Sequence, residues 1–172
     1  PSPVPRRCPG ALMYDRTNES LWSQIIGEAV VGDDTETKLE VFPSQLITFK
    51  EFSEKYPDGE VLSRETCHSR NYNFYPYGDY DSNNSLYFPV SVSDNRLPSK
   101  ELMFIVNTEE SSVAFKRSDL LETGKAEIQA GEIKVTAIVD GEEIEATDDS
   151  GNELAGYIAM WFSWASHHQE DG

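Results

Sequence analysis

The sequence predicts a mainly β fold of the α+β class: a single compact domain of antiparallel strands and hairpins with two short helices. The strongest sign is the run from Glu132 to Val139, which alternates as a strand does, turns at Asp140-Gly141 and returns as Glu142 to Thr147. Apolar residues make up 38% of the chain and aromatic residues 11%, enough to build a core. Its 172 residues fit one domain.

The N-terminal part divides into an arm and the start of the domain. Residues 1–10 hold four prolines and predict an irregular arm, so we place the globular domain at residues 11–172. Leu12 to Tyr14 and Ser20 to Ile26 are expected to be strands on either side of a turn at Thr17-Asn18.

The next segment predicts a strand and a helix. Leu39 to Phe42 has strand character, and Phe49 to Tyr56 follows a capping-box pattern in which Thr48 is the cap and Glu51 its partner. The apolar residues at helical spacing, which we expect to face the core, are Phe49, Phe52 and Tyr56.

The rest of the chain predicts short strands around one long loop. The loop, Asn71 to Ser85, carries five aromatic residues, and long loops inside compact domains are often functional. A brief helix is expected from Ser118, acting as its cap, to Leu121. Further strands are expected at Val61-Leu62, Leu86 to Val92, Glu101 to Val106, Val113 to Phe115 and Tyr157 to Trp164.

The charge of the chain excludes two classes of partner. With 31 acidic and 14 basic residues, the formal net charge is −17, which repels nucleic acid and anionic membranes. No apolar run reaches the roughly 18 residues of a membrane span, so we expect no membrane insertion. The sequence has no phosphate loop, dinucleotide fingerprint or Gly-x-Ser-x-Gly elbow, and we expect no cofactor.

The first candidate site is a set of carboxylates near the N-terminus. Asp15, Glu19 and Glu28 are candidate catalytic residues, because glycoside hydrolysis needs two carboxyl groups on either side of the scissile bond. The neighbouring side chains that we expect to contact substrate are Arg16, Trp22 and Gln24. The alternative is structural, with acid–arginine ion pairs tying the strands together and Glu28 on a solvated face.

The second candidate site is the aromatic loop. Flat rings alternate there with hydrogen-bonding groups, a composition that suits carbohydrate or peptide recognition. The candidate ligand-binding residues of this loop are Arg70, Tyr72, Tyr75, Tyr77 and Tyr80. The alternative is that these tyrosines attach a long loop to the body of the domain.

Two other features have weaker functional readings. His68, His167 and His168 could hold a metal ion, but adjacent histidines on a strand point to opposite faces, so we assign no metal ligands. The run Trp161 to Trp164 is expected to be core packing in a terminal strand that is covered on both faces.

Four blocks of this sequence carry a recognisable pattern. They are Met13 to Arg16 with Ser20 to Gln24 and Gly27 to Ala29; Tyr56 to Gly59 with Val61 to Ser63; Ser69 to Tyr72 with Pro76 to Tyr80; and Trp161 to Trp164 with His168. Together they resemble the domain-of-unknown-function family 3179 of bacteria and archaea. Members usually have a further stretch before the first block, so the chain resembles a short or N-terminally truncated member. The resemblance implies a globular, often exported domain, hence a place outside the cytoplasm, and no established activity.

These observations lead to two functional hypotheses. The first is a carbohydrate-directed hydrolase that uses two of the acids Asp15, Glu19 and Glu28. The second is a non-catalytic ligand-binding or structural domain outside the cytoplasm, and a mononuclear metal-binding domain is a weaker third. We expect the partner to be a small molecule or a carbohydrate.

Overall fold

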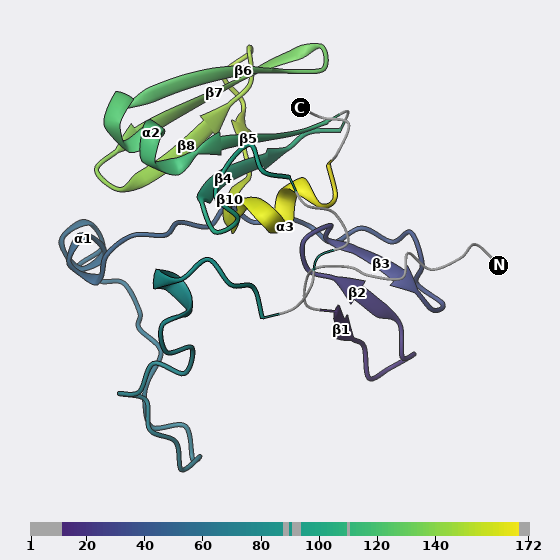
Figure 1. Ribbon diagram of the computed structural model, residues 1–172, viewed down its shortest axis with the longest axis vertical. Coiled ribbons are helices and arrows are strands. Elements are labelled where there is room, and N and C mark those ends of the chain that lie inside the picture. Colours follow the sequence, from purple (N-terminus) through teal and green to yellow (C-terminus); the bar gives the residue numbers. More distant parts are fainter. Residues whose placement is uncertain (1–11, 88–89, 91–93, 110, 169–172) are drawn as a thin grey trace.

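The computed structural model describes residues 12–87, 90, 94–109 and 111–168, and the predicted arm at residues 1–10 lies outside them. The predicted mainly β fold is confirmed. Within the described residues, ten strands form three antiparallel sheets, and they are joined by three short α-helices and one turn of 3-10 helix rather than by two helices. The chain forms a single compact domain (Figure 1).

Two of the sheets share the main core. One has the strand order β10-β4-β5 and the other β6-β7-β8-β9. The strands of the first are β4 (Leu102–Asn107), β5 (Ser112–Lys116) and β10 (Gly156–Met160). Those of the second are β6 (Lys125–Ala130), β7 (Ile133–Asp140), β8 (Glu143–Thr147) and β9 (Glu153–Leu154). Helix α2 (Arg117–Thr123) connects the two sheets and buries Leu120 in the same core.

Strand β4 is covered on both faces, as its nearly continuous apolar sequence requires. Alternate side chains point to opposite faces of a strand. Phe104 and Val106 therefore enter the core between the sheets, while Met103 and Ile105 face a second core formed with α3 (Trp161–Ala165). Figure 1 shows the resulting three layers, with α3 beneath the β10-β4-β5 sheet.

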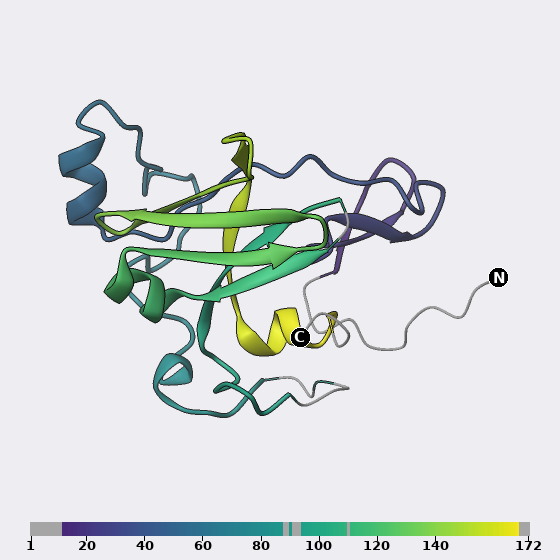
Figure 2. The same ribbon diagram turned by 90° about the horizontal axis from the view of Figure 1, so that it is seen from above.

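A third, smaller sheet is built from the first predicted hairpin. It has the order β1-β2-β3, formed by Leu12–Tyr14, Leu21–Ser23 and Glu28–Val31. Ser20 and Ser23 are buried in it, and Gly32 passes so close to Ser20 that an added Cβ would lie 2.6 Å from the Ser20 hydroxyl. The β1-β2-β3 sheet and helix α1 lie at opposite ends of the larger sheets (Figures 1 and 2).

Helix α1 (Phe49–Lys55) begins as predicted, because the Thr48 hydroxyl accepts a hydrogen bond from the Glu51 N–H at 3.2 Å. Polar contacts join this part of the chain to the β7–β8 hairpin. Thr48 N–H donates to Glu142, and the Gln45 side chain both donates to and accepts from the backbone of Ile144. The α1 segment is therefore held to the β7–β8 hairpin by polar contacts, which include ion pairs of Lys55.

Several predicted elements are confirmed. Strands were correctly expected at Leu12 to Tyr14, at Glu101 to Val106 and at Val113 to Phe115. The hairpin through Asp140-Gly141 is β7 and β8, and Asn71 to Ser85 is a loop with one 3-10 turn, η1 (Tyr80–Ser82).

Other predicted elements are wrong. Leu39 to Phe42 and Val61-Leu62 are not strands. Phe49 and Phe52 of α1, and Tyr56 just after it, pack on one another rather than entering the core, and Phe49 is 69% exposed. Ser118 does not cap α2, whose first residue is Arg117. The expected strand from Ser20 to Ile26 contracts to β2, and the one at Leu86 to Val92 falls partly outside the described residues.

Candidate functional site

The hairpin turn between β1 and β2 holds two of the predicted catalytic acids. Asp15 Oδ1 accepts a hydrogen bond from Thr17 N–H at 2.6 Å, and the Asp15 N–H donates to the carbonyl of Ser20 at 2.9 Å. Glu19 is exposed and has a φ of 59°, the left-handed conformation that closes the turn. Asp15 therefore acts here as the side chain that shapes its own turn.

The third predicted acid, Glu28, lies at the other end of the sheet. It pairs with Ser23, whereas Asp15 pairs with Ser20, and β2 lies between them, so they are two strand spacings apart laterally. At about 3.3 Å per residue and 4.8 Å per strand, the Cα atoms of Asp15 and Glu28 are roughly 14 Å apart. The small sheet thus places these two acids at opposite ends instead of bringing them together.

The neighbouring residues of the first block have different surroundings. Arg16 is exposed in the turn, and within the described residues it forms no ion pair with Asp15, Glu19 or Glu28. Trp22 is half-buried on β2 between Met13 and Ala29. Gln24 is the one residue of the predicted catalytic and substrate-binding set that lines one of the two pockets described below.

That pocket, which we call the junction pocket, has a volume of about 480 Å³ and lies where the small sheet meets β10 and α3. Its lining residues are Gln24, Ile25, Ile26, Gly27, Val41, Ser44, Asn107, Tyr157, Ile158, Ala159, Met160, Phe162 and Ser163. Apolar side chains dominate, and a few amide and hydroxyl groups converge on the same space. This is the usual composition of a small-molecule site.

A chain of hydrogen bonds fixes the polar side of the junction pocket. The buried indole N–H of Trp164 donates to Ser112 Oγ at 2.8 Å, and Ser112 Oγ donates to Asn107 Oδ1 at 2.6 Å. Asn107 Nδ2 then donates to the hydroxyl oxygen of Tyr157 at 3.4 Å. The network holds the Asn107 amide in one orientation and leaves the Tyr157 hydroxyl as a donor.

Burial raises the pKa of Tyr157, and the hydrogen bond from Asn107 partly offsets that effect. The phenol therefore stays protonated at neutral pH. It faces the pocket as a neutral group that can donate one hydrogen bond.

The aromatic loop packs largely on itself. The rings of Tyr75 and Tyr77 lie 5.6 Å apart, and Tyr87, which follows the loop, lies 4.2 Å from the ring of Tyr80. The Tyr87 hydroxyl donates to the carbonyl of Tyr77 at 2.8 Å, and the Tyr75 hydroxyl donates to Asp81. These contacts favour the structural alternative, in which tyrosines hold the loop in shape.

Two more residues predicted to bind ligand lie on the outer part of this segment. The Tyr72 hydroxyl is hydrogen-bonded to Thr66, and Arg70 is exposed. Neither lines the junction pocket. Ligand binding by the aromatic loop stays a prediction.

The hydroxyl of Tyr75 is expected to titrate with a pKa of about 12, because its hydrogen bond to Asp81 stabilises the protonated form. Burial and the negative charge of Asp81 act in the same direction. The pair thus contributes stability below the ordinary tyrosine pKa of 10 that is lost as the pH rises through 12. Phenolate absorbance, titrated in the wild type and in Asp81→Ala, measures this. Because Tyr56 and Tyr157 also have raised pKa values, a smaller high-pH phase is expected to remain in the variant, and a phase of undiminished amplitude would contradict the prediction.

The histidines do not form a metal site in the described part of the chain, where no group of three or more potential ligands is found. The His168 ring stacks on Trp164 at 5.1 Å, and His167 Nδ1 lies 2.9 Å from the Ser163 carbonyl oxygen. Both histidines therefore lie just beyond the end of α3 and contact residues of that helix.

Sequence reasoning missed the most buried acid described in the structure, Glu143. The residue is 4% exposed, and its carboxylate accepts from Lys55 Nζ at 2.6 Å and from the Tyr56 hydroxyl at 2.6 Å. Lys55 also lies 2.7 Å from Asp140. No local pattern marks this cluster, because its members come from α1 and from the β7–β8 hairpin, 85 or more positions away.

The fold and the junction pocket define a small layered β domain with a cavity of ligand size. The chain belongs to the family described as protein of unknown function (DUF3179), whose model matches residues 10–153. The suspected family is thereby confirmed, although the fourth resembling block, at Trp161 to Trp164, lies beyond the match. No curated protein and no solved structure matches the chain. Among the described residues, no helix is long and apolar enough to span a membrane.

Proposed function

We propose that this chain is a non-catalytic binding domain for a neutral saccharide, which occupies the junction pocket. The observation that carries the proposal is the lining itself. It combines two carboxamides, three hydroxyl groups and two aromatic rings, and none of its described residues is charged. In a chain of net charge −17, an uncharged pocket favours a neutral polar ligand.

The lining matches the two kinds of surface that a sugar presents. Sugar hydroxyls both donate and accept, and a carboxamide does the same from adjacent atoms, as Gln24 and Asn107 can. The carbon faces of a sugar ring pack on aromatic rings, which Tyr157 and Phe162 supply. Because the Asn107 amide is already held by Ser112, less side-chain entropy is lost when a ligand binds.

Binding is favoured over hydrolysis for this pocket because it needs no carboxylate pair, and no Asp or Glu is among its described lining residues. Hydrolysis by two of Asp15, Glu19 and Glu28 stays a prediction. In the second hypothesis, the Tyr72 to Tyr80 loop was the expected recognition surface. In this proposal the junction pocket takes the place of that loop, because the polar groups of the pocket converge on one cavity.

A panel of neutral oligosaccharides, screened by calorimetry, tests the proposal. Gln24→Ala is expected to weaken binding about fivefold, since a neutral hydrogen bond contributes roughly 1 kcal/mol. Tyr157→Phe, which removes only the hydroxyl, is expected to have a similar effect. Gln129→Ala, an exposed glutamine on β6, is the matched control and should leave the affinity unchanged.

Two results would contradict the proposal. One is a panel in which no saccharide binds to the wild type. The other is binding that neither Gln24→Ala nor Tyr157→Phe weakens. Reducing-sugar release that disappears in the amide variants of Asp15, Glu19 or Glu28 would instead support hydrolysis.

A further inference from the structure

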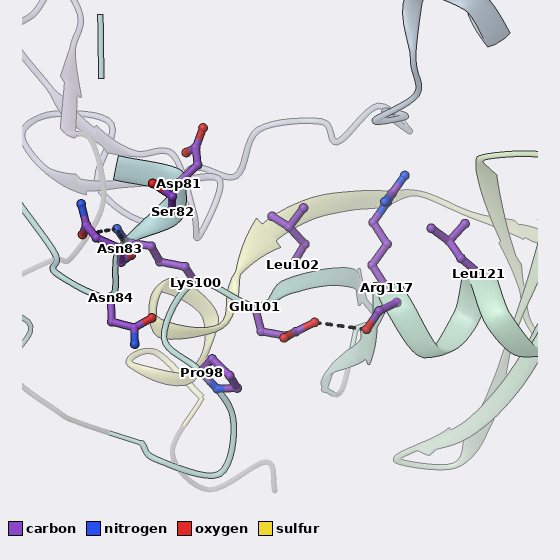
Figure 3. Close-up of a pocket in the computed structure, with 11 residues that line it drawn as sticks. Asp81, Ser82, Asn83, Asn84, Pro98, Lys100, Glu101, Leu102, Arg117 and Leu121 are labelled. Carbon is purple, nitrogen blue, oxygen red and sulfur yellow. Dashed lines mark hydrogen bonds between the residues drawn. The ribbon is translucent and has the colours of Figure 1, made fainter. Parts of the chain in front are cut away.

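A second pocket, of about 380 Å³, lies between η1 and α2 and has a different chemistry (Figure 3). We call it the α2 pocket. Its lining residues are Asp81, Ser82, Asn83, Asn84, Pro98, Lys100, Glu101, Leu102, Arg117, Ser118 and Leu121. Unlike the junction pocket, it brings together two acids and two bases.

Lys100 is fully engaged in holding the η1 wall of this pocket. Its ammonium group donates to the carbonyl of Tyr80 and to the carbonyl and side-chain oxygens of Asn83, at 2.9 and 3.3 Å for the two Asn83 contacts. It also lies 3.3 Å from the centre of the Tyr80 ring. An ammonium has three donors, so Lys100 positions the wall and has none left for a ligand.

Arg117, on the α2 side, still has donors to offer. Its Nη2 donates to the Leu46 carbonyl at 2.9 Å, while its Nε is buried and has no partner among the described residues. No carboxylate in the described part of the chain forms an ion pair with it. Because Nε is buried, a carboxylate in the pocket would accept from the other guanidinium N–H groups, for which no partner beyond the Leu46 carbonyl is found among the described residues.

Each of the two acids of the pocket has one carboxylate oxygen that accepts no hydrogen bond from the described residues. Asp81 uses Oδ2 to accept from Tyr75, and Glu101 uses Oε1 to accept from the Ser118 hydroxyl at 3.2 Å. Figure 3 shows Asp81 and Arg117 on opposite walls, with Leu102 between them and Leu121 beside Arg117. The two acids and two bases of the lining balance in charge, so a ligand that carries both a positive and a negative group fits this pocket better than a purely anionic one.

We propose that the α2 pocket binds a small zwitterion of the amino-acid type. The ligand carboxylate pairs with Arg117, its ammonium group lies near Asp81 and Glu101, and an aliphatic side chain packs on Leu102 and Leu121. Each part of the ligand then meets its complement: a cation, a pair of acids with unused oxygens, and an apolar surface. This site is separate from the junction pocket, and the inference does not depend on saccharide binding.

Calorimetry with three probes tests the proposal on the wild-type chain. L-Leucine carries both charges, L-leucinamide lacks the carboxylate, and N-acetyl-L-leucine lacks the ammonium group. Leucine is expected to bind, and each derivative to bind at least tenfold more weakly. The inference would be overturned if leucine did not bind. It would also be overturned if leucine and leucinamide bound equally, because the attraction of a cation to the acidic surface would then explain the binding.

Variants locate the site. Arg117→Gln is expected to weaken leucine binding at least tenfold and to make leucine and leucinamide bind with similar affinity. Lys116 is the charged neighbour of Arg117 and lies outside the pocket, so Lys116→Gln should change neither affinity. Asp81→Asn keeps an acceptor for Tyr75 and should reduce the advantage of leucine over N-acetyl-leucine. This second variant decides the question if Arg117→Gln does not fold, and leucine affinity unchanged in Asp81→Asn would then overturn the proposal.

Discussion

Trp164→Ala is expected to lower the free energy of unfolding by about 4 kcal/mol, a magnitude typical of large-to-small changes in a core. The Trp164 side chain is buried, its ring lies 5.4 Å from that of Trp161, and it covers the face of β4 that carries Met103 and Ile105. The truncation leaves a cavity that a five-residue helix cannot close by moving. Chemical denaturation measures the change, and a fall in Tm of roughly 10 °C should accompany it.

The same substitution is expected to disturb the junction pocket. Without the indole N–H, the Ser112 hydroxyl loses its buried donor, so the group that donates to the Asn107 amide is itself no longer held in one orientation. Trp164→Phe separates the two effects, because it keeps most of the ring but not the N–H. It should cost much less stability than Trp164→Ala while still weakening ligand binding. A loss below about 1 kcal/mol in Trp164→Ala would show that α3 is not part of the core.

The elements that could be predicted from the sequence are those whose signal is local. The β7–β8 hairpin depends on Asp140-Gly141, and Gly141 takes the positive φ that the pair predicts. The start of α1 depends on the Thr48 hydroxyl and the Glu51 N–H, which are three residues apart. In both cases, the residues that decide the structure are neighbours in the chain.

The elements that could not be predicted depend on tertiary context. Trp161 to Trp164 was expected to extend the last strand, but the chain turns into α3 at Trp161, which places Trp161 and Trp164 on one helical face. A short apolar run fits both the two-residue period of a strand and the 3.6-residue period of a helix, so its sequence cannot decide between the two structures. Strand β6 was missed because Lys125, Glu127 and Gln129 have weak strand propensity, and pairing with β7 provides the stabilisation instead.

The candidate sites show the same division. Gln24 was identified from its neighbours in the first block. Asn107 and Tyr157 were not, because they are 50 positions apart and meet only through the pairing of β4 with β10. The acids Asp15 and Glu28 are close in the chain, yet the register of the small sheet separates them. Proximity in sequence was therefore a poor guide to which polar groups share a cavity.

Glu143→Gln is expected to lower the Tm by several degrees at neutral pH. The buried carboxylate accepts from both Lys55 and Tyr56, and the amide keeps an oxygen for one of them but loses the ion pair. Removing one partner of a buried pair leaves the other poorly compensated. Because Lys55 is partly exposed, water replaces some of what it loses, so the effect is smaller than in a fully buried pair. Glu145→Gln, on the exposed face of β8, is the matched control.

The pH dependence of this loss identifies its cause. Burial raises the pKa of Glu143, but the hydrogen bonds from Lys55 and Tyr56 outweigh burial, so the pKa is lowered below 4.5. The pair therefore contributes stability above pH 4.5 that is lost as the pH falls through the lower folded-state pKa. The Tm difference between wild type and Glu143→Gln should shrink as the solution is acidified below that pH, while Glu145→Gln follows the wild type. A difference that stays constant with pH would mean that packing of the side chain, rather than its charge, joins α1 to the β7–β8 hairpin.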